Sequence, residues 1–175
     1  MGQPKQLMEF QGKPLIRHAA ETALASVCRP VVVVLGAFAE GIAPALAGLP
    51  VELVYNRNWE LGIGTSIHAG IEAVAKHDVQ GAILCLADQP LISAAIYNCL
   101  VATHATAGRD IVTSEYSGTV GVPVLFGRAL FPRLTGLAPD KGCKGVNLDH
   151  LEQTLRIPCP EAETDIDSPG DLERL

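Results

Sequence analysis

The chain has 175 residues, of which 48% are apolar and 18% charged, and a formal net charge of −6. Nucleic-acid binding is not expected, because it needs a clustered basic face and Lys and Arg form no run here. A membrane partner is not expected either, since no apolar run approaches the roughly 20 residues that a membrane span requires.

These properties predict one domain over residues 1–175 with a mostly aliphatic core. The N-terminus lacks the apolar segment and the cleavage site of a signal peptide, so we expect a cytoplasmic protein. The five cysteines are odd in number and form no CxxC pair, which argues against a zinc site or a disulfide framework. Cys85 and Cys99 lie in apolar patterns and are predicted to be core thiols.

Hydrophobic spacing predicts that strands alternate with helices along the chain. Helices are expected over residues 14–27, 37–47, 93–107, 127–135 and 143–152, and from Ser168 onward. A further helix is expected to begin near Thr65, with Thr65 or Ser66 as its N-cap. Strands are expected over 31–36, 51–56, 81–90, 110–114, 119–125 and 154–158. The continuous apolar runs VVVVLG and AILCLA are typical of strands that are buried on both faces.

This alternation predicts βαβ crossovers, and therefore an α/β fold with a mostly parallel sheet and helices on both faces. Ligands of such sheets bind beyond the carboxyl ends of the strands. That rule selects three candidates: Asn56 after the second strand, Asp88 after the third, and the loop GIGTS at residues 62–66.

Asp88 ends the apolar run AILCLAD, and Pro90 then turns the chain out of the sheet. A carboxylate at the mouth of a strand is a suitable Mg²⁺ ligand, because Mg²⁺ takes one or two carboxylates together with phosphates and waters. A turn-forming or helix-capping Asp is an equally good interpretation of this position.

Two further charged residues are candidates for binding a metal ion or a phosphate group. In ETDIDSPGDLERL, Asp167 is a second potential metal ligand, although Asp-Ser-Pro is also an ordinary helix start. Lys5, in the loop Gly-Gln-Pro-Lys before a helix, could neutralise phosphate, and a solvated surface lysine is the alternative interpretation.

Several stretches occur in an order that resembles one family: MGQPKQL, VVVVLGA, NRNWELGIGTSIHAGI, LADQP, GTVGVPVLFGRALFPRL, DKGCKG and DIDSPGDL. They resemble the MobA/MocA-like nucleotidyltransferases, and most closely the molybdenum cofactor cytidylyltransferase branch. The resemblance implies a three-layer, Rossmann-like sheet of the GT-A type. It also implies transfer of NMP from an NTP to a phosphorylated acceptor, with Mg²⁺ as cofactor and release of pyrophosphate.

The resemblance also implies roles for individual residues. Lys5 would contact the NTP phosphates, and Asp88 and Asp167 would hold Mg²⁺. Asn56, Gly62 and Ser66 would line the nucleotide pocket. The segment from Gly121 to Pro123 would lie on the acceptor side.

CTP and a pterin-type molybdenum cofactor are the expected substrates, and a molybdoenzyme or a chaperone is a further implied partner. Two alternatives stay open. One is a nucleotide-binding or partner-binding homologue with impaired catalysis, and the other is a nucleotidyltransferase for a different small phosphorylated acceptor. Where close relatives read GHPVLF, this chain reads GVPVLF, which removes a histidine from the acceptor side.

The family's loop is usually preceded by a strand and by an LAAGxSxR segment that ends in Met-Gly, the two residues with which this sequence begins. We therefore expect that the first strand and the glycine-rich loop are missing, and that Met1 is an internal methionine or the gene is truncated. In the family fold that strand is central, so VVVVLG and AILCLA would flank a gap lined with unpaired backbone groups.

Overall fold

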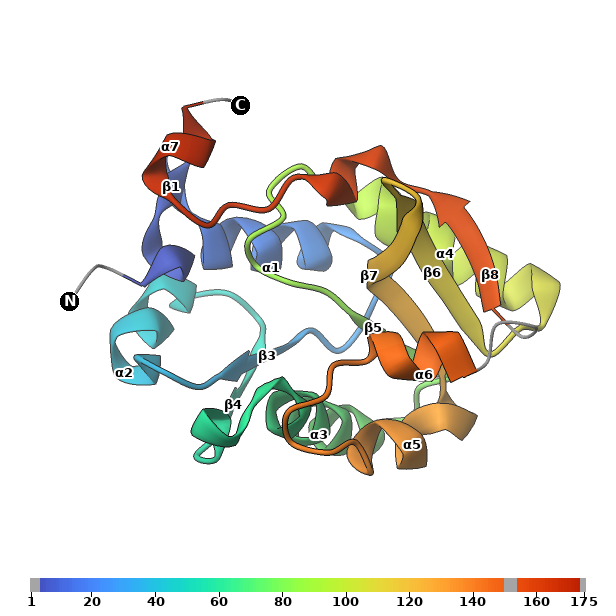
Figure 1. The fold of residues 1–175 in the computed structure, drawn as a ribbon. Helices are drawn as coiled ribbons and strands as arrows, with labels where there is room; N and C mark the ends of the chain where they lie inside the picture. The colour runs from blue at the N-terminus through green and yellow to red at the C-terminus, as the bar shows by residue number, and fades with distance from the viewer. Residues whose placement is uncertain (1–3, 150–153, 174–175) are drawn as a thin grey trace.

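The strands of the protein form two sheets and a small hairpin. The computed structural model describes residues 4–149 and 154–173 (Figure 1). One sheet contains two parallel strands, β3 (Val32–Leu35) and β4 (Glu52–Tyr55). The other sheet has the strand order β5-β7-β6-β8, and the hairpin pairs β1 with β2. The bounds of these other strands are Glu9–Phe10 for β1, Lys13–Pro14 for β2, Gly81–Leu84 for β5, Ile111–Tyr116 for β6, Thr119–Gly127 for β7 and Thr154–Pro158 for β8.

Helices cover both faces of the four-stranded sheet (Figure 1). Neighbouring residues of β7 point to opposite faces, so Phe126 packs with Ile71 of α3, whereas Leu125 packs with Leu100 of α4. The α-helices are α1 (Leu15–Ala25), α2 (Ala39–Ile42), α3 (Ile63–Ala75), α4 (Ala94–Ala107), α5 (Phe131–Thr135), α6 (Lys144–Asp149) and α7 (Pro169–Leu172). Short 3₁₀ turns lie at Lys5–Leu7 (η1), Ala43–Leu46 (η2), Trp59–Leu61 (η3), Arg128–Leu130 (η4) and Pro160–Glu163 (η6). No helix in these ranges is long and apolar enough to cross a membrane.

The α/β architecture with helices on both faces is confirmed. The strand pairing is more mixed than the mostly parallel sheet that alternation predicts, because β7 runs antiparallel to both β5 and β6. The helix expected over 143–152 is described only as Lys144–Asp149, and its predicted end lies outside the described residues.

Helix α3 begins two residues earlier than expected, at Ile63, and neither Thr65 nor Ser66 is its cap. Gly62 occupies the cap position with a φ of 125°, a conformation that favours glycine. The Thr65 hydroxyl is hydrogen-bonded to the carbonyl oxygen of Gly62 at 2.8 Å, inside the first turn. The local pattern Gly-Ile-Gly-Thr-Ser therefore places its hydroxyls within the helix.

A large apolar cavity, which we call the slot, lies between the facing edges of β3 and β5. Its volume is about 1020 Å³, and its walls include residues of both strands and of helices α1 and α3. Among the described residues, β3 pairs only with β4, and β5 pairs only with β7. The four residues of β5 are consequently half-buried, not buried on both faces as the apolar run predicts.

The prediction that Cys85 and Cys99 are core thiols is wrong, because both are exposed. Cys85 follows β5 and lines the slot, so that solvent reaches a side chain from an otherwise apolar run. Cys99 lies on α4, whose apolar residues are not confined to one face, and this weak pattern misassigns its side.

We predict that Gly64→Ala destabilises the fold. A Cβ atom at residue 64 would collide with the carbonyl oxygen of Ala138, where the backbone of residues 138–141 crosses α3. Because the obstacle is backbone, overpacking should cost about 1–3 kcal/mol of the free energy of unfolding. Urea unfolding measures this change.

The matched control is Gly145→Ala. Gly145 also lies in a helix, but a Cβ atom there meets nothing within 4 Å. This variant should be as stable as the natural chain, or more stable by up to about 1 kcal/mol. Equal unfolding curves for the two variants would show that the 138–141 segment does not pack on α3 as described.

Candidate functional site

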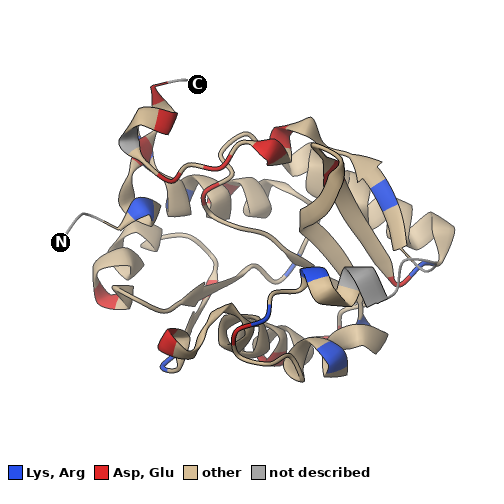
Figure 2. Cartoon of the chain, viewed as in Figure 1, with Lys and Arg blue, Asp and Glu red and all other residues tan. Residues whose placement is uncertain are grey.

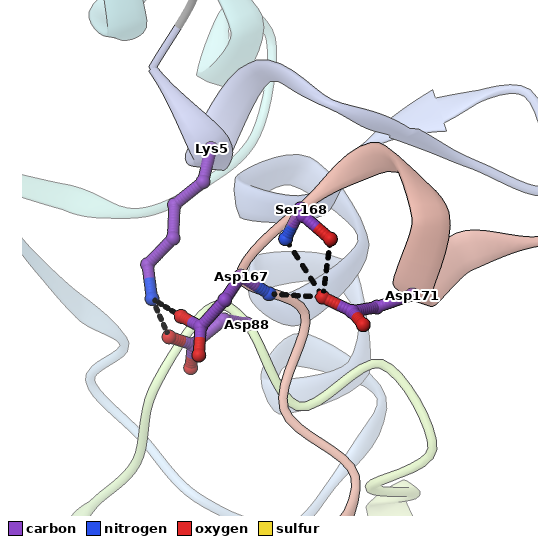
Figure 3. Close-up of polar contacts among 5 residues, drawn as sticks. All are labelled: Lys5, Asp88, Asp167, Ser168 and Asp171. Carbon is purple, nitrogen blue, oxygen red and sulfur yellow. Dashed lines mark hydrogen bonds and ion pairs between the residues drawn. The ribbon is translucent and has the colours of Figure 1, made fainter.

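Three charged side chains from distant parts of the sequence meet beyond the carboxyl end of β5 (Figure 3). The Lys5 ammonium donates to Asp88 Oδ2 at 2.5 Å and to Asp167 Oδ1 at 2.8 Å. Lys5 comes from η1, Asp88 from the turn after β5, and Asp167 from the segment before α7. The structure thus brings together the lysine and both carboxylates that the sequence singles out.

The C-terminal segment is fastened to the turn after β5 by backbone and apolar contacts. The Ile166 N–H donates to the carbonyl oxygen of Asp88 at 2.8 Å, and the Ile166 side chain is fully buried. Ser168 and Asp171 cap the N-terminus of α7 and form a capping box (Figure 3). The carboxylate of Asp167 is therefore not the helix cap, and it points to Lys5 instead.

The cluster lies in an acidic environment, because Asp or Glu occurs at five of the eleven positions from 161 to 171 (Figure 2). Partial burial alone would lower the pKa of Lys5, but the hydrogen bonds and charges of Asp167 and Asp88 outweigh it and raise that pKa. Burial raises the pKa of Asp165, and the negative charge of Asp88 raises it further. The neighbourhood therefore disfavours additional negative charge and attracts cations.

The donor set fits a divalent cation held mainly by substrate and water. Asp88 Oδ1 is buried and has no hydrogen-bond partner, so one oxygen of this carboxylate is available to a ligand. No group of three or more His, Cys, Asp or Glu residues that could hold a metal occurs in the described part of the chain. Two carboxylates are nevertheless enough for Mg²⁺, which keeps several waters and binds substrate phosphates.

The residues expected in the nucleotide pocket lie together at the end of β4 and the start of α3. Asn56 is buried, and its amide donates to Thr65 Oγ1 at 2.8 Å and to Ser66 Oγ at 3.0 Å. A Cβ atom on Gly62 would lie 2.5 Å from the carbonyl oxygen of Pro139, so glycine permits close approach of that loop. None of the hydrogen bonds described for Asn56 or Ser66 reaches Lys5, Asp88 or Asp167.

Gly121 and Pro123, expected on the acceptor side, lie in β7 next to β6. Ser114 donates to the carbonyl oxygen of Pro123 at 2.7 Å, and the Tyr116 hydroxyl occupies the space that a Cβ atom on Gly121 would need. These contacts fix the position of this part of β7.

Sequence reasoning missed Gln89, which is buried directly after Asp88. Its amide donates to the carbonyl oxygen of Ala162 at 2.8 Å, so it ties the turn after β5 to the C-terminal segment. Its Oε1 atom is buried without a partner. The available signal was a polar residue between Asp88 and Pro90 in an otherwise apolar stretch.

The family model of the MobA-like NTP transferase domain matches residues 1–154 of the chain. The chain belongs to this family. A relative from Paenarthrobacter nicotinovorans, nicotine blue oxidoreductase, is 36% identical over 101 residues, which cover 58% of the chain and 48% of that protein. The bifunctional protein GlmU of Mycobacterium sp. strain KMS is 31% identical over 132 residues, 73% of the chain and 26% of GlmU. The chain thus spans about half or less of these relatives.

Solved structures agree with the fold of the MobA-like family. Rv0371c from Mycobacterium tuberculosis H37Rv has a TM-score of 0.84 at 22% identity, with 99% of this chain and 89% of that chain covered. The molybdopterin-guanine dinucleotide biosynthesis protein A of Archaeoglobus fulgidus has a TM-score of 0.69 at 17% identity, with coverages of 99% and 89%. CMP:2-keto-3-deoxy-manno-octonic acid synthetase complexed with CTP has a TM-score of 0.70 at 15% identity, with coverages of 97% and 89%. At these identities, the likeness shows the fold.

We predict that Lys5→Met lowers stability at neutral pH and that this difference disappears in alkali. The pKa of Lys5 is raised in the folded state above its unfolded value of about 10.4. The charged form therefore stabilises the fold below that pH, and the contribution is lost as pH rises through the folded-state pKa. Solvent screens the partly exposed pair, so the loss should be roughly 0.5–1 kcal/mol.

Urea unfolding between neutral pH and strong alkali measures the difference between the two proteins. The matched control is Lys141→Met, since Lys141 and its partner Asp140 are both largely exposed. Its effect on the free energy of unfolding should be close to zero at every pH. A Lys5→Met difference that stays constant through alkaline pH would contradict a role for the ammonium charge.

Proposed function

We propose that this MobA-like NTP transferase domain is a Mg²⁺-dependent cytidylyltransferase that transfers CMP from CTP to the phosphate of a pterin-type molybdenum cofactor. The observation that carries the proposal is the convergence of Lys5, Asp88 and Asp167 beyond the carboxyl end of β5. A cation with two carboxylates at this edge of the sheet suits a phosphate-rich substrate that binds together with a divalent metal ion.

The reaction requires an oxygen of the acceptor phosphate to attack the α-phosphorus of CTP. A new P–O bond forms, the bond from the α-phosphorus to the bridging oxygen of the β-phosphate breaks, and pyrophosphate leaves. Both reactants are anions, so positioning and positive charge are the main requirements. Lys5 would move from the carboxylates to the nucleotide phosphates and stabilise the negative charge of the transition state.

Asp88 and Asp167 would hold the divalent cation, and the unpartnered Oδ1 of Asp88 supports this role. A divalent cation held there would offset the negative charge of the phosphates. A structure of Rv0371c in complex with manganese, with a TM-score of 0.80 at 22% identity, supports a divalent ion, and we propose Mg²⁺ as the natural one.

The remaining assignments concern the base and the acceptor. Asn56, Gly62 and Ser66 would line the nucleotide pocket, since they adjoin one another at the carboxyl end of β4. CTP is favoured by the structural likeness to a synthetase that binds CTP. A molybdenum cofactor as acceptor is supported by the likeness to a molybdopterin-guanine dinucleotide biosynthesis protein, with Gly121 and Pro123 on the acceptor side.

The test is Asp88→Asn, assayed for Mn²⁺ binding by electron paramagnetic resonance and for release of pyrophosphate from CTP with molybdopterin as acceptor. We expect metal affinity to fall by about 10-fold or more and transfer by about 100-fold or more, because one charged ligand is lost. The matched control is Asp78→Asn, because Asp78 is exposed and lies between α3 and the amino end of β5, at the opposite end of that strand from Asp88. It should leave both unchanged.

Full transfer activity in Asp88→Asn would refute the role of this carboxylate. Calorimetry with CTP, GTP and ATP in Mg²⁺ distinguishes the alternatives. Tight nucleotide binding without turnover on any acceptor would support a homologue with impaired catalysis. Turnover on a sugar phosphate, but not on molybdopterin, would assign a different small acceptor.

A further inference from the structure

Gln89 is a buried polar residue directly beside the candidate site. It follows Asp88 in the turn after β5, and only 4% of its surface is exposed. Burying a long amide side chain removes its hydrogen bonds to water and its rotational freedom, and both losses oppose folding. The Oε1 atom is buried without a partner, which adds to the cost. An apolar side chain of the same length would avoid these penalties, so a role for the amide N–H groups explains the presence of glutamine.

The amide of Gln89 joins the turn after β5 to the C-terminal segment. Its Nε2 atom donates to the carbonyl oxygen of Ala162, in η6, at 2.8 Å. A second contact of Nε2, with the carbonyl oxygen of Val122 in β7, is longer, at 3.5 Å. Ala162 is fully buried, so water does not compete for the shorter bond. The contact with Ala162 is therefore the one that holds the two segments together.

A backbone hydrogen bond runs between the same two segments. The Ile166 N–H donates to the carbonyl oxygen of Asp88 at 2.8 Å. Two consecutive residues, Asp88 and Gln89, thus hold the C-terminal segment at Ile166 and at Ala162. The stretch between these two positions is fixed at both ends, and Asp167 is the residue that follows it. The two bonds consequently determine where the backbone of Asp167 lies.

The carboxylate of Asp167 has little else to hold it. Its side chain is 76% exposed, and its only ion pair with the residues that the structure describes is with Lys5 (Figure 3). The described ion pair of Asp88 is also with Lys5. In the proposed reaction Lys5 moves to the nucleotide phosphates. The distance between the two carboxylates then depends on the backbone that carries them.

We infer that Gln89 is a positioning residue of the candidate site: its hydrogen bond to Ala162 keeps Asp167 beside Asp88, so that both carboxylates reach one divalent cation after Lys5 has left. The inference rests on the proposed function, because it takes Asp88 and Asp167 as the ligands of that cation. Gln89 touches neither cation nor substrate and acts through the C-terminal segment. Loss of a group one step removed from a metal typically lowers metal affinity by about 10–100-fold.

The test is Gln89→Met, which keeps the length of the side chain and removes its hydrogen-bonding groups. Without metal, hydrogen exchange at the Ile166 amide should be at least about tenfold faster, because the C-terminal segment loses one of its two bonds. Mn²⁺ affinity, measured by electron paramagnetic resonance, should fall by about 10-fold or more. The matched control is Gln80→Met, the same substitution at an exposed position just before β5, and it should change neither value.

A double-mutant cycle shows whether Gln89 acts through Asp167. When Asp167→Asn has already removed that ligand, adding Gln89→Met should lower Mn²⁺ affinity by less than about twofold. An equally large loss in both backgrounds would overturn the inference, because it would show an effect on the fold that does not pass through Asp167. Gln89→Asn, whose amide is one methylene group shorter, should reproduce the Gln89→Met results and replaces that variant if it does not fold.

The inference and the proposed function fail on different results. Natural Mn²⁺ affinity or natural Ile166 exchange in the folded Gln89 variants would overturn the positioning role, even where the natural chain transfers CMP. If the natural chain binds Mn²⁺ and shows the expected coupling of Gln89 to Asp167 but releases no pyrophosphate from CTP, the proposed function fails and the positioning role stands.

Discussion

Backbone hydrogen bonding between strands is the constraint on which the rest of this structure depends. Apart from the β1-β2 hairpin, the strands of the described residues form two sheets whose facing edges are not hydrogen-bonded to each other, and the slot lies between them. Helix α3 connects the two parts, since Gly70 lies close to Val34 of β3 and Ile71 packs with Phe126 of β7. The two sheets are therefore joined mainly by side-chain contacts with α3, whereas backbone hydrogen bonds join the strands of a continuous sheet.

The candidate site is formed by residues that are far apart in the sequence and meet at the turn after β5. Lys5 and Asp167 are separated by 162 positions, yet both bind at the turn after β5. The buried side chain of Ile166 and its hydrogen bond to the backbone of Asp88 hold the C-terminal segment there. The polar cluster consequently gathers the N-terminal segment, the end of β5 and the C-terminal segment around one lysine.

Much of this arrangement could be predicted from the sequence, because apolar runs identify strands and the ends of strands identify sites. Residues 154–158 form the expected strand, and Asp88 and Asn56 lie beyond the carboxyl ends of β5 and β4. Other features depend on contacts that no local pattern encodes. The antiparallel direction of β7 and the bond from Gln89 to Ala162 are long-range outcomes. The early start of α3 follows from the backbone conformation of Gly62.

The position of the Asp88 carboxylate depends on how firmly β5 is held in its sheet. The hydrogen bond from Ile166 and the ion pair with Lys5 hold Asp88. In the described part of the chain, however, the preceding strand β5 is paired along only one edge. A strand with an unpaired edge opens more readily than a strand paired on both sides. A carboxylate that positions a cation must be held to within about 0.5 Å. The precision available at Asp88 is therefore limited by the pairing of β5, and the contacts from Ile166 and Lys5 must hold the carboxylate in place.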